Sequence, residues 1–115
     1  MNGAYVPERG DLVWIDFSPQ SGREQGGRRP ALVLSPRSYN RRTRLALMCP
    51  ITSQVKGYLT EVALPLALQT RGVVLADHLR SLDWTTRATD FIEQAPPELL
   101  EDVMHILQAL LPPTS

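Results

Sequence analysis

The sequence contains one cysteine, no long hydrophobic run and no excess of either charge. A lone cysteine excludes an internal disulfide, and Cys49 lies in the apolar segment LALMCPI, which predicts a buried and unreactive thiol. No stretch approaches the roughly 18 apolar residues that a membrane-spanning helix needs. The N-terminal segment MNGAYVPERG also lacks the apolar core of a signal peptide. We therefore expect a cytoplasmic protein that has no contact with a membrane.

Acidic and basic residues are equal in number, at 12 each, but they are unevenly distributed. Seven of the basic residues fall between positions 23 and 44: Arg23, Arg28, Arg29, Arg37, Arg41, Arg42 and Arg44. Only Glu24 is acidic in that segment, whereas residues 90–115 contain five acids and no Lys or Arg. This asymmetry predicts one face that attracts a polyanion. For the last three arginines, a solvated hairpin tip is an equally good interpretation.

Length and composition indicate a single globular unit. At 115 residues the chain can bury one modest core, so we expect one domain over residues 1–115. A hydrophobic fraction of 43% is ordinary for globular proteins and excludes a disordered chain. No internal repeat, low-complexity tract or linker interrupts the sequence.

Short apolar runs bounded by turn residues predict β-strands along most of the chain. The expected strands cover residues 12–17, 31–34, 45–51, 61–64, 72–76 and, more weakly, 79–84. In the first of them Trp14 and Asp16 share one face, whereas the other face is wholly apolar. The polar connection SPRSYNRRTR can hold a short helical turn.

The apolar period changes near the end of the chain, where hydrophobic residues recur every three or four positions. This pattern predicts a helix that begins at Pro97, ends before Pro112 and has apolar residues on two faces. The whole pattern therefore predicts a mainly β (β+α) fold, a small barrel-like antiparallel sheet closed or capped by a C-terminal α-helix.

Polar candidates for a site stand at the predicted strand ends. The segment SPQSGREQGGRRPALVLSP places Arg29 directly before Pro30, which opens the second strand. Thr52 follows the third strand, and Asp77 follows the fifth. If consecutive strands are antiparallel, Arg29 and Thr52 are neighbours at one sheet edge. A guanidinium beside a hydroxyl suits a phosphate, so the residues by themselves predict a small anion-binding barrel.

Several segments together resemble the MazF/PemK toxins, which are sequence-specific endoribonucleases of bacterial toxin–antitoxin pairs. The resemblance lies in GDLVWIDFSP, REQGGRRPALVLSP, MCPITSQVKGY and GVVLADHLRSLDW. It implies an SH3-like barrel with a C-terminal helix, assembled as a homodimer that binds single-stranded RNA in grooves at the dimer interface. It also implies metal-free cleavage, without any cofactor, to a 2′,3′-cyclic phosphate and a 5′-hydroxyl. The implied protein partner is a small MazE-like antitoxin.

Carried over by position, the resemblance implies that Arg29, Thr52 and Glu24 are catalytic. Glu24 is favoured as the general base because its loop also holds the arginines, with Asp77 and His78 as alternatives. This chain has Leu75 where some members have an arginine two residues before the aspartate, and His78 where glutamine is common. The residues expected to bind RNA are Asp16, Gln25, Arg28, Ser53, Gln54, Lys56, Asp77, His78 and Arg87.

Two other functions are compatible with the same fold. A gyrase poison of this fold uses aromatic C-terminal residues, and the chain ends in LLPPTS, which argues against it. A non-catalytic RNA-binding module would keep the basic loop and lose Arg29 or Thr52, and both are present. Endoribonuclease activity is therefore the favoured hypothesis.

Overall fold

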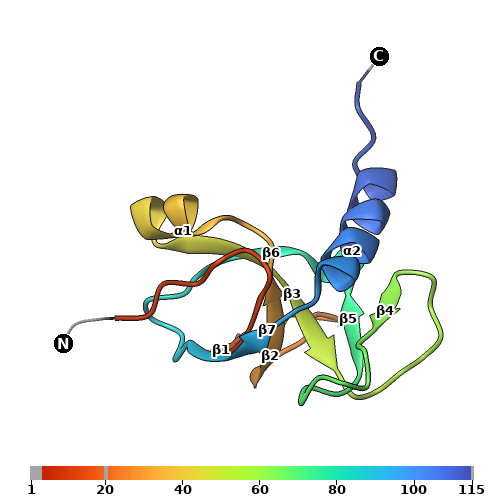
Figure 1. Cartoon of the computed structure of the whole chain (residues 1–115), viewed down its shortest axis with the longest axis horizontal. Coiled ribbons are helices and arrows are strands. Elements are labelled where there is room, and N and C mark those ends of the chain that lie inside the picture. The colour runs from red at the N-terminus through yellow and green to blue at the C-terminus, as the bar shows by residue number, and fades with distance from the viewer. Residues whose placement is uncertain (1–3, 20, 115) are drawn as a thin grey trace.

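The computed structural model describes residues 4–19 and 21–114, which form one antiparallel sheet and two α-helices (Figure 1). In chain order the elements are β1 Asp11–Asp16, β2 Arg28–Val33, α1 Arg37–Thr43, β3 Leu45–Thr52, β4 Glu61–Ala63, β5 Val73–Leu75, the 3-10 turn η1 Ala76–His78, β6 Arg80–Asp83, β7 Asp90–Gln94 and α2 Pro97–Leu110. The predicted mainly β fold with a C-terminal helix is confirmed.

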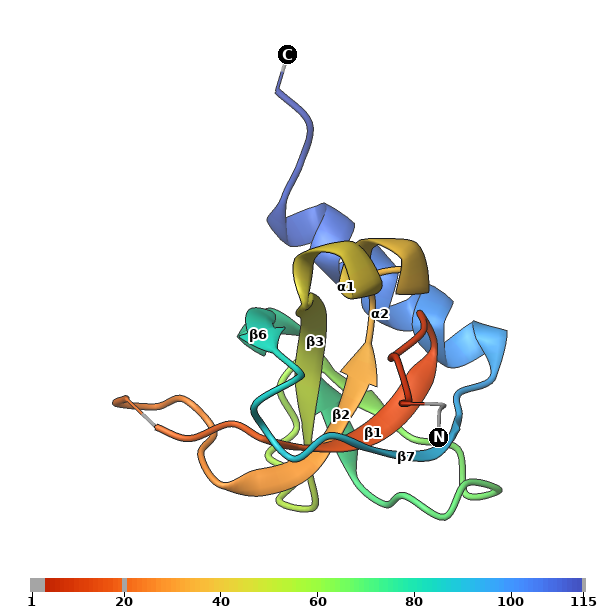
Figure 2. The ribbon, with the colours of Figure 1, turned by 90° about the vertical axis from the view of Figure 1, so that its left-hand side faces the viewer.

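β3 is the strand around which the sheet is arranged. It pairs with β2 on one side, where Leu32 lies opposite Cys49. On its other side the first half of β3 pairs with β6, and its end pairs with β5, where Thr52 lies opposite Val73. The remaining order runs β2, β1, β7 on one side and β5, β4 on the other. Among the described residues these pairings do not close into a ring, although the sheet is barrel-like in its curvature (Figure 2).

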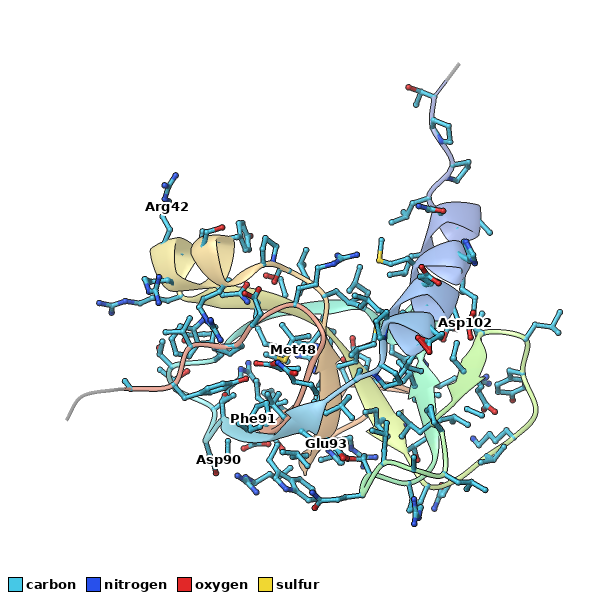
Figure 3. All side chains as sticks on the ribbon, viewed as in Figure 1. Arg42, Met48, Asp90, Phe91, Glu93 and Asp102 are labelled. Atoms are coloured by element: carbon cyan, nitrogen blue, oxygen red, sulfur yellow. The ribbon has the colours of Figure 1, made fainter. Side chains whose placement is uncertain are left out.

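Strand alternation divides the core between the two faces of the sheet. One face is covered by α2 and consists of Leu12, Leu32, Leu34, Cys49, Ile51, Val62, Leu64, Val74, Ala76, Leu99, Val103 and Leu107. The other consists of Val13, Ile15, Phe17, Ala31, Val33, Ala46, Met48 and Leu82. Figure 3 shows Met48 inside the body of the protein. Cys49 is buried, which confirms the location predicted from the sequence, and its burial raises the pKa of the thiol to about 12.

β2 begins at Arg28, before the start at Ala31 that the apolar run predicts. The cause is pairing with β1, in which Asp16 lies opposite Arg28 and Ile15 opposite Arg29. The two arginines are therefore strand residues instead of loop residues. Their backbone is held by the neighbouring strand, so their side chains leave the sheet at defined positions.

β7 has no strand signal in the sequence, because DFIEQ contains only two adjacent apolar residues and no alternation. It forms by pairing with β1, where Val13 lies opposite Phe91 and Trp14 opposite Asp90. Glu93 on the same strand accepts hydrogen bonds from the backbone of Gln69 and Thr70. β7 thus ties the β4–β5 loop to the sheet.

The arginine-rich connection forms the helix α1 and not a hairpin tip, and Asn40 is the reason. Asn40 is fully buried, and its amide nitrogen donates to the carbonyls of Pro7 at 2.8 Å and Ser35 at 3.0 Å. Its own backbone carbonyl accepts the indole N–H of Trp84 at 3.0 Å. One polar side chain therefore anchors a helix whose other residues are exposed or charged.

α2 buries one apolar stripe, formed by Leu99, Val103 and Leu107. Apolar surface is uncovered at the end of the helix and directly after it, since Leu110 is 50% and Leu111 68% exposed. No helix in residues 4–19 and 21–114 is long and apolar enough to cross a membrane. The homodimer expected from the two apolar faces of this helix stays a prediction.

We expect Asn40→Ala to lower the free energy of unfolding by about 2–3 kcal/mol, because it leaves buried carbonyl groups without a donor. Ser38→Ala, on the exposed side of the same helix, is the control and should change the free energy by less than about 0.5 kcal/mol. Urea denaturation of both variants is the measurement. Equal midpoints for the two would contradict the anchoring role of Asn40.

Candidate active site

The candidate residues gather where β2 begins and β3 ends. Ala31 pairs with Pro50, and continuing this register by two residues brings Arg29 level with Thr52. The antiparallel pairing assumed from the sequence is therefore observed. The loop between β1 and β2 reaches outward from this edge of the sheet (Figure 2).

Two arginines hold the root of that loop by its backbone. Arg80 on β6 donates to the carbonyl of Phe17 at 2.9 Å. Arg87 donates to the carbonyl of Asp16 at 3.0 Å and to that of Ser18 at 2.7 Å. Three successive carbonyls that leave the sheet thus each receive a charged donor. Charge-assisted bonds of this kind are roughly twice as strong as neutral ones, so the loop leaves β1 in a fixed direction.

Asp16 contributes to the same root. Its carboxylate accepts the backbone N–H of Ser18 at 2.9 Å. That hydrogen bond holds the pKa of Asp16 below its usual range, and the charges of Arg87 and Arg28 add to the effect. Asp16 and Arg87, both predicted to bind RNA, therefore lie at the loop root and form contacts within the protein.

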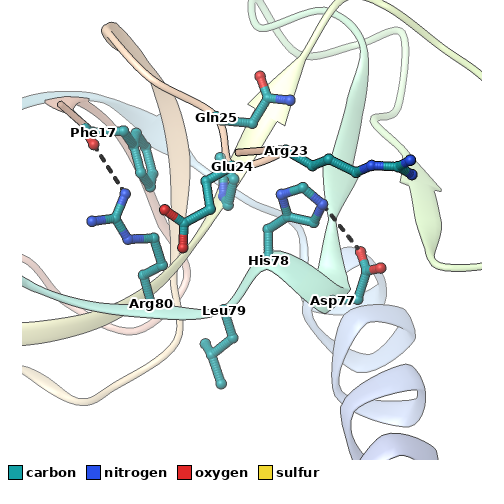
Figure 4. Close-up of a pocket in the computed structure, with 9 residues that line it drawn as sticks. Phe17, Arg23, Glu24, Gln25, Asp77, His78, Leu79 and Arg80 are labelled. Carbon is teal, nitrogen blue, oxygen red and sulfur yellow. Dashed lines mark hydrogen bonds and ion pairs between the residues drawn. The ribbon is translucent and has the colours of Figure 1, made fainter. Parts of the chain in front are cut away.

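A first cavity of about 270 Å³ opens beside this root (Figure 4). Glu24 and Arg23 reach it from the loop, and Asp77 and His78 reach it from η1. The His78 Nε2 atom lies 3.9 Å from a carboxylate oxygen of Asp77. Arg80 lines the same cavity, so the acid of the loop faces both a histidine and a guanidinium.

A second cavity of about 440 Å³ contains Thr52. The Thr52 hydroxyl accepts the backbone N–H of Gln54 at 3.1 Å, and the residue is only 8% exposed. Lys56 and Tyr58 border the cavity from the β3–β4 loop. Asp77 and His78 line this cavity as well as the first, which makes η1 the ridge between them.

Arg29 borders a third groove of about 480 Å³, together with Ser53 and Trp14. The Arg29 Nε atom donates to the carbonyl of Gly26 at 3.1 Å, which orients the guanidinium. Arg28, in the same groove, pairs with Asp90 at 2.5 Å and stacks over the Trp14 ring at 5.5 Å. Arg28 is thus partly engaged within the protein, whereas the Nη atoms of Arg29 have no partner among the described residues.

The predicted site residues therefore share one edge of the sheet but not one pocket. Of these residues, the first cavity is lined by Glu24, Gln25, Asp77 and His78. The second is lined by Gln25, Thr52, Gln54, Lys56, Asp77 and His78. The third is lined by Arg28, Arg29 and Ser53. The first two cavities adjoin, because Gln25, Asp77 and His78 line both, whereas the third shares no lining residue with either. A ligand that contacts all of the predicted residues therefore has to be extended.

Sequence reasoning missed the cavity residues Arg23, Tyr58 and Arg80. Tyr58 is 62% exposed, and an exposed aromatic residue after Lys56 in a polar loop is a signal that could have identified it. Arg80 has no such signal, because only the pairing of β6 with β3 brings it to the loop root. Within the described part of the chain, no three His, Cys, Asp or Glu side chains gather so that they could hold a metal ion.

Gly72 packs closely against the backbone of Thr52. Its φ of +113° lies in a region that other residues rarely adopt, and a Cβ at this position would stand 2.0 Å from the Thr52 carbonyl oxygen. The close approach lets β5 begin directly beside the end of β3. The location of Thr52 therefore depends on the absence of a side chain at residue 72.

Comparison with known proteins agrees with this architecture. Residues 8–111 match the family of PemK-like, MazF-like toxins of type II toxin–antitoxin systems. The endoribonuclease toxin MazF of Escherichia coli (strain K12) is 49% identical over 100 residues, which cover 86% of this chain and 89% of that protein.

Solved structures are similar over the same span. The crystal structure of MazF (Form-I) from Deinococcus radiodurans has a TM-score of 0.91 and 56% identity, and the match covers 94% of this chain and 98% of that one. The MazE–MazF complex (Form-II) from the same organism gives a TM-score of 0.87 and 54% identity, covering 96% and 100%. The similarity therefore includes the strands and loops that form the cavities.

We expect Gly72→Ala to lower the free energy of unfolding by about 3 kcal/mol or more, through backbone strain and overlap with Thr52. The amide resonances of Thr52 and Ser53 should shift with it. Gly57→Ala is the matched control, because Gly57 also has a positive φ, +82°, but a Cβ added there would meet no heavy atom within 4 Å. It should lose only the strain, about 1–2 kcal/mol. Equal losses would contradict the contact with Thr52.

Proposed function

Because the chain belongs to the PemK-like, MazF-like toxins of type II toxin–antitoxin systems, we propose that it is a toxin endoribonuclease that cuts single-stranded RNA at a short sequence motif. The observation that carries the proposal is the antiparallel pairing of β2 with β3, which brings Arg29 and Thr52 to the same end of the sheet. The distribution of the predicted residues over three cavities suits an extended strand rather than a compact ligand.

The reaction begins with attack of a ribose 2′-hydroxyl on the adjacent phosphorus. The new bond joins phosphorus to the 2′-oxygen as the bond to the 5′-oxygen of the next nucleotide breaks. A base takes the proton of the 2′-hydroxyl, and an acid supplies one to the departing 5′-oxygen. The upstream product is a 2′,3′-cyclic phosphate and the downstream product has a free 5′-hydroxyl. No metal or other cofactor takes part in this route.

Arg29 and Thr52 stabilise the negative charge that develops on the phosphoryl oxygens. A guanidinium keeps its protons near neutral pH, so Arg29 acts through charge and paired donors. Its Nε is held by Gly26, which leaves the Nη atoms to face the RNA. The Thr52 oxygen already accepts the Gln54 N–H, so its own proton is free to be donated to a phosphoryl oxygen.

The general base comes from the group formed by Glu24, Asp77 and His78, all of which line the first cavity. Glu24 is our first choice because it lies on the loop whose root is fixed by Arg80 and Arg87. Asp77 and His78 are the alternatives, since they also line the cavity of Thr52. Separate Glu24→Gln, Asp77→Asn and His78→Gln variants distinguish the three.

The remaining residues along the edge bind and align the RNA. We assign this role to Gln25, Arg28, Ser53, Gln54 and Lys56, which offer amide, hydroxyl and cationic donors, and to Asp16 and Arg87 through the loop root. The exposed ring of Tyr58 offers a face on which a base can stack. The motif that is cut then depends on the loops that carry these residues.

The proposal includes a partner and an assembly. A MazE-like antitoxin, by analogy with the MazE–MazF complexes, would block the same cavities with an acidic segment, and its binding should weaken with added salt. We expect a homodimer, for which the uncovered Leu110 and Leu111 offer part of the apolar surface. The expected location is the cytoplasm, where messenger RNA is available.

We expect Arg29→Ala to reduce cleavage of RNA by about a hundred- to a thousandfold without unfolding the protein, since the side chain lies outside the core. Arg29→Lys should recover little, because a single ammonium does not reproduce the paired donors. Initial rates on a fluorescent RNA, with circular dichroism as the folding control, test this. Near wild-type rates for Arg29→Ala would remove Arg29 from the site.

We expect cleavage to continue in EDTA and to stop when the ribose on the 5′ side of the cut is replaced by deoxyribose. The deoxy substrate lacks the attacking group but keeps nearly all binding contacts, so it should act as a competitive inhibitor. Mass spectrometry of the products should show the cyclic phosphate upstream. Loss of activity in EDTA, or cleavage of the deoxy substrate, would refute attack by the 2′-hydroxyl.

A further inference from the structure

Two exposed arginines near the end of α1, and a third directly after it, lie outside every cavity of the candidate site. We call Arg41, Arg42 and Arg44 the α1 arginine patch. With 3.6 residues per turn, Arg42 lies about 200° around the helix from the buried Asn40, and Arg41 lies beside it. Figure 3 shows Arg42 pointing away from the body of the protein. All three arginines are exposed, and Arg42 lies on the side of the helix opposite the anchoring Asn40.

The charge of the patch is not neutralised within the protein. In the described residues, none of its arginines makes an ion pair, whereas Arg37 on the same helix lies 3.9 Å from Glu8. Asp83 is close enough to be affected by Arg44, but its lowered pKa comes first from a hydrogen bond donated by Thr85. The patch thus keeps a net positive field.

The conformation of Arg44 is a second indication that charge matters here. Arg44 ends α1 with a φ of +62°, the left-handed region in which glycine or asparagine is favoured. An arginine there costs roughly 1 kcal/mol relative to glycine. A basic residue near the helix end is favourable by a similar amount, but Arg41 and Arg42 already supply it. The end of the helix therefore does not require a third arginine at this strained position.

The patch and the candidate site lie at opposite ends of the same strands. α1 connects the end of β2 to the start of β3, whereas Arg29 and Thr52 lie at the other ends. The eight-residue β3 separates the two regions by about 23 Å, at roughly 3.3 Å per residue. A nucleotide at the cleavage point cannot reach the patch, but a longer strand can.

We propose that the α1 arginine patch binds the phosphate backbone of the RNA substrate away from the cut, so that long RNAs are held more tightly than short ones; this rests on the proposed function. The positive charges of the patch attract a phosphate backbone, whose bound counterions they release. Tyr39, 39% exposed beside the patch, can stack on an unpaired base. A lipid surface is disfavoured, because the exposed face of α1 has no Leu, Ile or Phe to insert.

The test uses Arg41→Ala, Arg42→Ala and Arg44→Gly combined in the full chain, which leaves Asn40 unchanged and relieves the strain at residue 44. The matched control replaces the same three arginines by lysine. Cleavage is measured on the shortest oligonucleotide that the wild type cuts and on a long transcript that carries the same motif. Binding of the intact transcript is measured in an Arg29→Ala background as a function of salt.

The neutral variant should cut the oligonucleotide at the wild-type rate and lose roughly tenfold in kcat/KM on the transcript, and the lysine variant should retain most of it. The dependence of log affinity on log salt should become shallower by about 2, for three phosphate contacts to a single strand. Equal losses on both RNAs, or an unchanged salt dependence, would overturn the proposal. So would a neutral variant that loses binding to vesicles of phosphatidylserine while its RNA binding is unchanged.

Failure of the proposed function would look different. If the wild type cuts neither RNA, the endoribonuclease assignment fails, and the binding series still decides whether the patch contacts a phosphate backbone. If the lysine variant loses as much affinity as the neutral variant, while neither melts below the wild-type temperature, the patch does not act through its charge and the proposal is wrong.

Discussion

β2 and β3 pair antiparallel through residues that are buried on both faces of the sheet, and α1 closes the connection at their far end. A strand that is packed on both sides cannot slide by one residue without moving its apolar side chains to the wrong face. The positions of Arg29 and Thr52 relative to one another are therefore set by the core. The same constraint sends the α1 arginine patch to the opposite end of the molecule.

Backbone groups, more than side-chain pairs, hold the candidate site in place. The β1–β2 loop is fixed at its root by guanidinium groups on three successive carbonyls, and the end of β3 is fixed by the close approach of Gly72. Charged donors to carbonyls keep a loop in position while leaving its own side chains free. Glu24 and Arg23 can therefore face a cavity instead of being used to hold the loop.

The arginines near the candidate site make different kinds of contact, which depend on their surroundings. Arg28 is paired with Asp90 and stacked on Trp14, Arg80 and Arg87 bind backbone carbonyls, and Arg29 is oriented by Gly26. In the sequence these positions differ little, because each is a basic residue near a strand end. Most of their partners are far away along the chain, on β7, the β1–β2 loop and the end of β1.

Apolar periodicity was sufficient to predict six of the strands and the C-terminal helix, because burial imposes a period of two on strands and of about 3.6 on helices. Antiparallel order of those strands then predicted the edge shared by Arg29 and Thr52. The segment DFIEQ lacks such a period and became β7 only through its pairing with β1. The polar segment around Asn40 became a helix because one amide found buried carbonyls distant in the sequence. Local pattern therefore determined most elements of this protein. The distribution of its site residues over three cavities was decided by the tertiary structure, through strand pairings and hydrogen bonds between distant residues that no local pattern encodes.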